Sequence, residues 1–385
     1  MKVAFVYDAV YPWVKGGGEK RIYELGKRLA AQGHEVHVFG VKWWSGARTI
    51  GNEGMILHGV CAPMELYVDG RRSISEAIFF SLRLFFSLIG EKFDVIDVSV
   101  FPYFSCYSAK LVSILRGNPM IITWHEVWGN YWYEYLGSGG FAGKLIEFTV
   151  SRLNAKSIAV SGMTKRNLEA LGVSGSDIHI IPNGIDLRRI AGIQPSNYKC
   201  DIIFIGRLIK EKNAGILLEA IGHVKKVRPD VQCSIIGDGP EKEKLVRFAA
   251  GYGLSDNVRF FGFMDYDEMI ARLKSSKMLI LPSGREGFGM VVIEAFACGV
   301  PVITVNSPRN AASLLVNEDT GLVVGLDTLE LAEAICTLVK DRTLRQKMSS
   351  SLLEKAEEYD WDRIVGQLTR LYEGSMASKD KSGDI

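Results

Sequence analysis

The chain has 385 residues, of which 47% are apolar, and its formal net charge is +2. This length suits about two domains of 150–200 residues, and the apolar content excludes a mainly disordered chain. The near-neutral charge gives no electrostatic footprint for nucleic acid, so we expect no nucleic-acid partner. The small basic excess, about +4, lies before residue 190, so the first half would face any anionic surface.

The cysteines and the apolar runs bear on the compartment. The six cysteines are far apart and form no C-x-x-C pair, so we interpret them as small core residues in a reducing interior. The longest apolar stretch, Ala77–Ile89, contains Arg83 and falls short of the roughly 20 residues that span a bilayer. No targeting segment is visible. We therefore expect a cytoplasmic protein, with peripheral contact at the inner face of the membrane as an open alternative.

The first half alternates short apolar runs with amphipathic stretches. Helical patterns separate most of these apolar runs. The first predicted helix extends from Glu19 to Gln32 and ends before Gly33. Strands alternating with helices predict a parallel α/β sheet covered on both faces. The predicted strands cover residues 3–7, 35–40, 94–98, 120–123, 157–160 and 178–181.

The same rhythm restarts after a segment rich in turn formers, residues 182–199. The sequence thus predicts an α/β fold with two tandem, doubly wound, Rossmann-like domains, at residues 1–190 and 191–357. A helix over 358–375 and a flexible tail over 376–385 complete the chain. The strands predicted in the second domain cover residues 201–206, 232–237, 258–262, 278–282, 301–304 and 321–324.

Three consecutive glycines, Gly16, Gly17 and Gly18, follow the first strand and precede the first helix. Glycines allow close backbone approach, and the helix N-terminus offers free N–H groups to an anion. The pattern is neither G-x-G-x-x-G nor a Walker A loop. A plain connecting loop remains the alternative.

Basic residues follow the first strand of the second domain, in the segment 206–213 with Arg207 and Lys212. Ligands of open α/β sheets bind at the carboxyl ends of the strands, and these cations suit a diphosphate. A solvated charged loop is the alternative. Two weaker candidates end later strands: Gly237 in a G-D-G-P turn, and Phe263 with Met264, whose backbone could pair with a base or simply end a core strand.

The most informative stretch is residues 281–301, LPSGREGFGMVVIEAFACGVP. A strand ends at Pro282, and a helix is predicted to begin near Met290 with its first N–H groups aimed at the loop. Glu294 would lie about one turn inside that helix, well placed to accept hydrogen bonds from ligand hydroxyls. An incidental acidic pair is the alternative. The loop residues singled out are Glu286, Gly287, Phe288 and Gly289.

Together these motifs resemble the retaining, nucleotide-sugar-dependent glycosyltransferases of family 4, which have the two-domain GT-B fold. The resemblance covers residues 1 to about 375 and rests on EGFG with its E-x7-E spacing, GRL-x-KEKN (206–213), GDGP (237–240), IPNGID (181–186), VSGMTKRNL (160–168) and the glycine loop. It implies that the two domains face a cleft and that the late helix returns to the first domain.

The resemblance also implies residue roles. The donor diphosphate would be held by Arg207 and Lys212, its ribose by Glu294, and its sugar by Glu286 and the backbone after it. The glycine loop would close over the phosphates. A first-domain histidine near the transferred sugar corresponds to His125, for which a satisfied loop histidine is the alternative reading. No cofactor is implied beyond the nucleotide diphosphate sugar as donor substrate.

One segment departs from the family pattern. The loop after the strand at 301–304 often reads G-G-x-x-E in the family, whereas residues 306–313 here contain no acid. This puts part of the sugar or phosphate contact in doubt, although not the fold.

No metal site is predicted. Two Asp-x-Asp triplets, Asp265–Asp267 and Asp360–Asp362, occur where about one is expected by chance, and both suit helix starts. The six histidines form no metal-binding pair on one helix face.

The acceptor is predicted only in outline, as a glycan or a lipid-linked molecule. Aromatic residues crowd the segment 124–135, and they could stack on sugars, lie at a membrane interface or form a subcore. The 77–89 stretch suits either a membrane-surface helix or a buried helix on the sheet.

Three other functions fit these motifs less well. A dinucleotide-dependent oxidoreductase needs G-x-G-x-x-G, which neither domain has. A phosphorylase of the same fold needs a pyridoxal lysine that cannot be located. A non-catalytic nucleotide-sugar-binding protein would be favoured if Arg207, Lys212 or Glu286 were missing, and all three are present.

Overall fold

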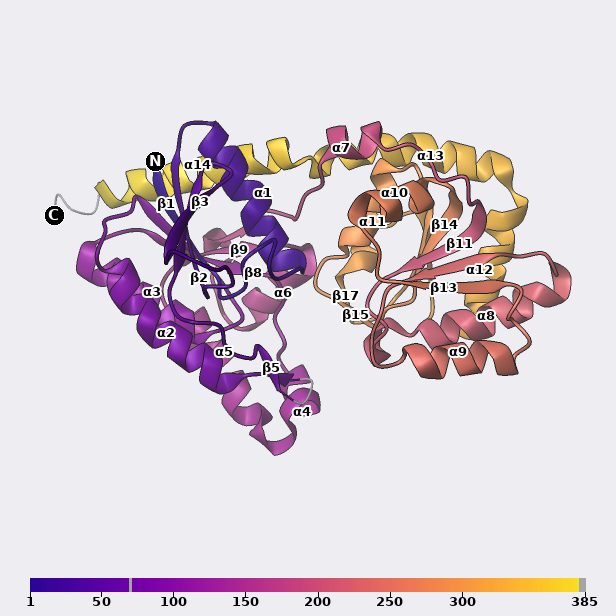
Figure 1. Ribbon diagram of the computed structural model, residues 1–385, viewed down its shortest axis with the longest axis horizontal. Helices are drawn as coiled ribbons and strands as arrows, with labels where there is room; N and C mark the ends of the chain where they lie inside the picture. The colour runs from indigo at the N-terminus through magenta and orange to yellow at the C-terminus, as the bar shows by residue number, and fades with distance from the viewer. Residues whose placement is uncertain (69–70, 381–385) are drawn as a thin grey trace. The chain divides into compact units, whose positions relative to one another are not determined.

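The computed structural model describes residues 1–68 and 71–380 and forms two compact units (Figure 1). The first holds Met1–Asn183 together with the chain from Trp361 onward, and the second holds Gly184–Asp360. Each unit is an α/β domain with a central, mainly parallel sheet, as the sequence predicts. The division falls a few residues before the predicted boundary at 190.

The first unit contains an eight-stranded sheet with the order β10-β9-β8-β7-β1-β2-β4-β3. All neighbours are parallel except β3 and β4. The central strands β1, β2, β7 and β8 are buried on both faces, which explains their high Val, Ile and Phe content. They are β1 (Lys2–Val6), β2 (Glu35–Gly40), β3 (Thr49–Asn52), β4 (Met55–Gly59), β7 (Val95–Ser99), β8 (Met120–Trp124), β9 (Lys156–Ala159) and β10 (Ile178–Ile180), with a separate ribbon of β5 (Tyr67–Val68) and β6 (Arg71–Arg72).

Two hydrophobic clusters, one on each face of this sheet, fix its helices. One contains Phe80 and Leu84 of α2, packed with α3 and with the inward side chains of the sheet. The other joins α1 to the chain's last helix. The helices are α1 (Gly17–Ala31), α2 (Ile74–Leu88), α3 (Phe104–Arg116), α4 (Tyr131–Leu136), α5 (Gly140–Ser151), α6 (Gly162–Ala170) and α14 (Trp361–Asp380).

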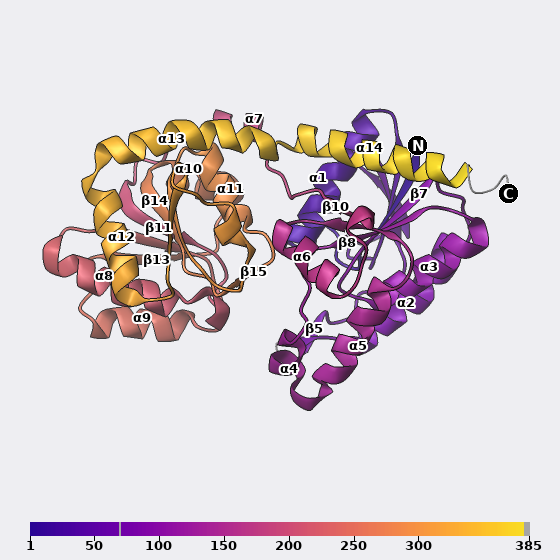
Figure 2. The same cartoon turned by 180° about the vertical axis from the view of Figure 1, so that it is seen from behind.

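Helix α14 returns to the first unit, as the family resemblance implies. Its Trp361, Leu368 and Tyr372 are buried against α1 and the sheet (Figure 2). The Tyr372 hydroxyl donates to Asp97 of β7 at 2.6 Å. The helix extends to Asp380, so residues 376–380 are helical where a flexible tail is predicted, and residues 381–385 lie outside the described part.

The second unit contains a six-stranded, all-parallel sheet with the order β13-β12-β11-β14-β16-β18. All six predicted strands are present. They are β11 (Cys200–Ile205), β12 (Cys233–Ile236), β13 (Val258–Gly262), β14 (Ser276–Leu281), β16 (Val302–Val305) and β18 (Gly321–Val324), with β15 (Arg285–Glu286) paired to β17 (Arg309–Asn310). The helices are α7 (Leu187–Gly192), α8 (Ala214–Val227), α9 (Lys242–Gly251), α10 (Tyr266–Lys274), α11 (Met290–Ala297), α12 (Thr328–Lys340) and α13 (Arg342–Ala356).

Candidate active site

Each sheet reverses its strand order at one point, and the predicted site residues collect there. In the first unit the order turns between β1 and β7, and in the second between β11 and β14. Ligands of open α/β sheets bind at the carboxyl ends of the strands that flank such a reversal. Each unit therefore holds its own group of candidate residues.

The glycine loop of the first unit leads directly into α1. The helix begins at Gly17, two residues before the predicted Glu19, so Gly17 and Gly18 form part of its first turn. A Cβ on Gly18 would stand 3.2 Å from the Tyr7 hydroxyl and 3.3 Å from His125 Nε2, whereas one on Gly17 would meet nothing. Gly18 thus allows α1 to approach His125, and Gly17 leaves open space beside the helix start.

His125 follows β8 and faces the same group of residues. Its Nε2 lies 3.4 Å from the Ser99 hydroxyl at the end of β7. Burial, and to a lesser extent the charge of Arg21, lowers the pKa of His125 to about 3. The imidazole is therefore neutral at physiological pH, able to give or accept a hydrogen bond but unsuited to act as a charged acid.

A buried cation, Arg21, lies near His125 in the first unit, and it is not among the residues that the sequence motifs singled out. Its guanidinium donates to the Pro182 carbonyl at 2.5 Å and to Asn183 Oδ1 at 3.0 Å. Burial is the main cause that lowers its pKa to about 10, and Asp97 opposes that shift. Arg21 thereby ties α1 to the end of the first unit's chain. The IPNGID motif (181–186), which supplies both acceptors, is the signal that could have found it.

In the second unit, three strand-end loops interlock above β11, β12 and β13. A Cβ on Gly237 would lie 1.9 Å from the Gly206 carbonyl oxygen, and one on Gly239 would lie 2.4 Å from that of Leu208. Gly237 also has φ of +138°, a region that favours glycine. The G-D-G-P turn therefore shapes the loop that carries Arg207, which is itself exposed.

Lys212 and Glu286 form an ion pair across the strand-order reversal. Lys212 follows β11 and Glu286 follows β14, and their side chains are 17% and 13% exposed. The two loops are also joined by backbone, since the Gly284 N–H donates to the Glu211 carbonyl at 2.9 Å. The structure thus brings together two predicted residues that are far apart in the chain.

The EGFG loop is held by the segment in which the family acid is absent. Strand β15, with Glu286, pairs with β17, and Ser307 donates to the Gly284 carbonyl at 2.7 Å. Fully buried Asn310 donates to the Val305 carbonyl at 2.8 Å and accepts from the Ala312 N–H at 3.1 Å. The segment therefore supports the loop through an amide side chain.

The start of α11 is shaped for close packing. Gly289, its N-cap, has φ of +104°, and a Cβ there would lie 2.7 Å from that of Ala312. Phe288 is buried, and the helix begins at Met290 as predicted. Gly287 lies between Glu286 and Phe288, so this half of the site presents backbone beside the Lys212–Glu286 pair.

Glu294 is buried, whereas Phe263, in the segment after β13, is exposed. Glu294 lies one turn inside α11, is only 6% exposed, and forms a hydrogen bond with the Tyr266 hydroxyl. Burial, and next the Glu294 carboxylate, raise the pKa of Tyr266 well above its usual value. Phe263 is 71% exposed directly after β13, and Met264 is half-buried.

The aspartate triplets stand at helix starts, as predicted. Asp265 is the N-cap of α10, and Asp267 forms an ion pair with Arg189 at 2.9 Å. Asp362, in the first turn of α14, forms an ion pair with Arg28 at 2.8 Å.

The structure brings His37 and His58 together, with their ring nitrogens 2.7 Å apart and Glu91 nearby. This pair was not predicted from the sequence, because β4, which carries His58, was not predicted.

The aromatic segment 124–135 is largely a subcore. Trp124 and Trp132 are buried, and Trp128 packs against Trp132 with ring centroids 4.6 Å apart. Buried Glu147 of α5 anchors the segment by accepting from the Trp128 and Gly129 N–H groups at 2.7 and 2.8 Å. Most of these rings are therefore engaged inside the first unit.

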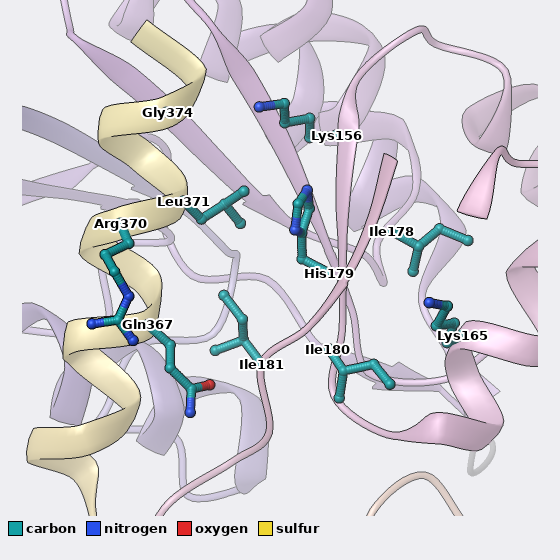
Figure 3. A pocket seen from close by; sticks show the side chains of 10 residues that line it. All are labelled: Lys156, Lys165, Ile178, His179, Ile180, Ile181, Gln367, Arg370, Leu371 and Gly374. Atoms are coloured by element: carbon teal, nitrogen blue, oxygen red, sulfur yellow. The ribbon is translucent and has the colours of Figure 1, made fainter. Parts of the chain in front are cut away.

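A cavity of about 620 Å³ lies away from both groups, at the β10 edge of the first sheet (Figure 3). Strand β10, the first residue of β9, α6 and α14 border it, and its charged lining residues are all basic. None of the predicted site residues lines it. The lining consists of Lys156, Lys165, Ile178, His179, Ile180, Ile181, Gln367, Arg370, Leu371 and Gly374.

Solved structures share this fold. The chain superposes on sucrose-phosphate synthase from Thermosynechococcus elongatus with a TM-score of 0.81 at 21% identity, covering 98% of this chain and 99% of that one. It superposes on the Anabaena protein HepE in complex with UDP with a TM-score of 0.76 at 18% identity, covering 97% and 100%. At these identities the likeness establishes the GT-B fold.

Sequence comparison adds the family. Among curated proteins, the phosphatidyl-myo-inositol mannosyltransferase of Mycobacterium leprae is 33% identical over 231 residues, which cover 58% of this chain and 60% of that protein. The match thus spans less than two thirds of that relative. The family model "Glycosyltransferase Family 4" matches residues 15–189, and "Glycosyl transferases group 1" matches residues 191–353. Because the two models together cover most of the chain, the protein belongs to the group 1 glycosyltransferases of family 4.

Proposed function

We propose that the protein is a retaining glycosyltransferase that moves a hexose from a nucleotide diphosphate sugar to the hydroxyl group of a sugar or lipid-linked acceptor. The observation that carries the proposal is the Lys212–Glu286 pair at the strand-order reversal of the second unit, with Arg207 on the adjoining loop. This is where an open α/β sheet binds its ligand, and the charges suit a diphosphate.

The pair serves both ends of such a donor. The Lys212 ammonium has three donors, so it can keep Glu286 and also bind a phosphate oxygen. Glu286 in turn orients Lys212 and keeps acceptor capacity for a sugar hydroxyl. In the reaction the diphosphate is the leaving group, and Arg207, Lys212 and the N–H groups at the start of α11 stabilise its growing negative charge.

The first unit contributes uncharged groups in this account. The family resemblance assigns His125 to the transferred sugar, and a neutral imidazole suits a hydrogen bond to a sugar hydroxyl. No side chain is assigned as a nucleophile. The acceptor hydroxyl therefore attacks the anomeric carbon of the donor sugar from the same face from which the diphosphate leaves. The leaving phosphate takes the proton of the acceptor hydroxyl. This step follows from the family resemblance.

The acceptor is proposed to be lipid-linked or otherwise membrane-borne, with the protein in peripheral contact with the inner face of the membrane. The mannosyltransferase relative supports this, since its name specifies a phosphatidylinositol acceptor. Among the residues that the structure describes, no helix is long and apolar enough to cross a bilayer.

The test is a screen of UDP-, GDP- and ADP-linked hexoses for hydrolysis and transfer, with the anomeric configuration of the product read by NMR. We expect turnover of at least one donor with retention, and activity that persists in chelator because cationic side chains act on the diphosphate. Binding without turnover of any donor would favour the non-catalytic alternative, and an inverted product would refute the retaining mechanism.

A further inference from the structure

The outer surface of three helices in the first unit is unusually apolar. Helices α2, α3 and α5 lie on one side of the sheet (Figures 1 and 2), and hydrogen bonds between neighbours join them. Ser81 of α2 bonds with Ser108 of α3 at 2.9 Å, and Tyr107 of α3 bonds with Thr149 of α5 at 2.5 Å. The three helices therefore present one continuous layer, called here the three-helix face.

Large apolar side chains occur on the solvent side of each helix in this layer. On α2 they recur at helical spacing opposite Phe80 and Leu84, which are fully buried. Phe86 is 72% exposed, Leu82 61% and Ile114 65%. The exposed set is Ile74, Ile78, Phe79, Leu82 and Phe86 on α2, Leu111, Ile114 and Leu115 on α3, and Phe141, Leu145 and Phe148 on α5. Exposed apolar side chains gathered on neighbouring helices in this way are typical of an interaction surface.

On the solvent side of these three helices, all the charged side chains are positive. Their two acids, Glu76 and Glu147, are fully buried and point inward, Glu147 toward Tyr103 at 2.8 Å. Arg83 and Arg116 are exposed, and Lys110 and Lys144 are half-buried. The three-helix face thus combines apolar side chains with positive charge and no exposed acid.

The rim of the face also has a basic hollow. A cavity of about 300 Å³ between α2 and the β3–β4 hairpin is lined by Arg48, Arg83 and Phe86, among others, and by no acid. A phosphate group there would lie beside two guanidinium groups and at the edge of the apolar surface. This arrangement matches a lipid, whose anionic headgroup and acyl chains are joined.

We infer that the three-helix face docks on an anionic lipid bilayer, with the apolar side chains inserted at the interface and the cations against the headgroups. Apolar burial combined with attraction to anionic lipids is how interfacial helices bind. A second copy of the chain fits less well, because a symmetric contact would bring the cations against one another. The inference extends the membrane contact of the proposed function and places it on named residues.

The test is sedimentation with vesicles of equal parts phosphatidylcholine and phosphatidylglycerol, and with phosphatidylcholine alone. The protein should pellet with the anionic vesicles, and Phe86→Ser or Ile114→Ser should each weaken that binding about tenfold. Arg83→Glu should weaken it about fivefold or more. The matched controls are Leu329→Ser and Arg247→Glu on exposed positions of the second unit, and both should bind like wild type.

Three outcomes would overturn the inference: no pelleting of wild type with anionic vesicles, equal binding of wild type and Phe86→Ser, or a wild-type dimer that Phe86→Ser makes monomeric. Hydrolysis of the soluble donor, measured without vesicles, should be unchanged in Phe86→Ser, since this residue is exposed and lies outside both groups of candidate site residues. Loss of vesicle binding with intact hydrolysis thus separates the docking surface from the proposed activity.

Discussion

The two units hold charge at their strand-order reversals in opposite ways. In the first unit the cation Arg21 is buried and donates from one guanidinium nitrogen to the main-chain oxygen of Pro182 and the amide oxygen of Asn183, and His125 near it is neutral. In the second unit Arg207 is exposed, and Lys212 is held by a carboxylate that still has acceptor capacity. The same Rossmann-like pattern therefore carries a buried cation and a neutral histidine in the first unit, and an exposed cation beside an ion pair in the second.

The difference indicates a division of labour. A buried cation that is hydrogen-bonded within its own unit joins two segments of that unit, because its loss would leave the acceptor oxygens without a donor. An exposed cation near an ion pair can change partners when a ligand arrives. We therefore assign the diphosphate to the second unit and the uncharged contacts with sugar to the first.

The largest effect should come from Lys212→Ala. It removes a phosphate-binding cation and leaves Glu286, a half-buried carboxylate, facing the diphosphate. We expect kcat/KM to fall by about two to three orders of magnitude, the scale of losing one charge-stabilising group. The double variant Lys212→Ala/Glu286→Gln should recover part of the nucleotide binding because the repulsion is gone. No recovery would argue that the two side chains do not act on the same ligand.

A second effect concerns the neutral His125 of the first unit. Its folded pKa of about 3 lies below the unfolded value of about 6.5, so the unfolded state takes up the proton first. The corresponding stability is present above pH ~6.5 and is lost as the pH falls toward 3. Between pH 7 and pH 5 this group should cost about 2 kcal/mol of unfolding free energy.

The check is to compare that pH dependence in wild type and His125→Gln by denaturant unfolding. The variant should lose less stability between pH 7 and pH 5, whereas the exposed His223→Gln control should follow wild type. Equal slopes for wild type and His125→Gln would contradict a half-buried, neutral His125 with a lowered pKa.

A smaller effect tests the glycine loop. Gly17→Ala places a methyl group in open space at the helix start, so it should raise stability by about 0.4–1 kcal/mol. If the loop approaches the donor phosphates, the same methyl group should lower kcat/KM about tenfold. The control is Gly192→Ala, which also meets no neighbour. A more stable Gly17→Ala enzyme with unchanged kcat/KM would remove Gly17 from the donor contacts.

Most strands of the two sheets could be predicted from the sequence, because buried parallel strands are recognisable as short apolar runs. The β3–β4 hairpin could not, since Thr49–Asn52 is short and half-exposed at the sheet edge. The two-residue strands β15 and β17 leave no periodic signal either. With β4 missed, the contact between His37 and His58 was missed too.

The candidate site was predictable to a different degree in each unit. The motifs singled out Lys212 and Glu286 as candidates, but they did not predict that the two side chains pair. In the chain 74 positions separate them, and only the strand order brings them together. Arg21 was missed because a single arginine on an amphipathic helix normally lies in solvent. Its burial depends on acceptors more than 160 residues away.

The most direct test of the central claim is calorimetric binding of UDP, GDP and ADP to wild type and to Arg207→Ala. Because Arg207 is exposed, the variant should fold and melt like wild type. We expect at least one nucleotide to bind wild type, and Arg207→Ala to bind it more weakly by about 1.5–3 kcal/mol, the scale of a charge-assisted hydrogen bond. Arg247→Ala, at an exposed position on α9, should bind it like wild type. Unchanged binding by Arg207→Ala, or no binding of any nucleoside diphosphate by wild type, would contradict the assignment of the diphosphate to the second unit.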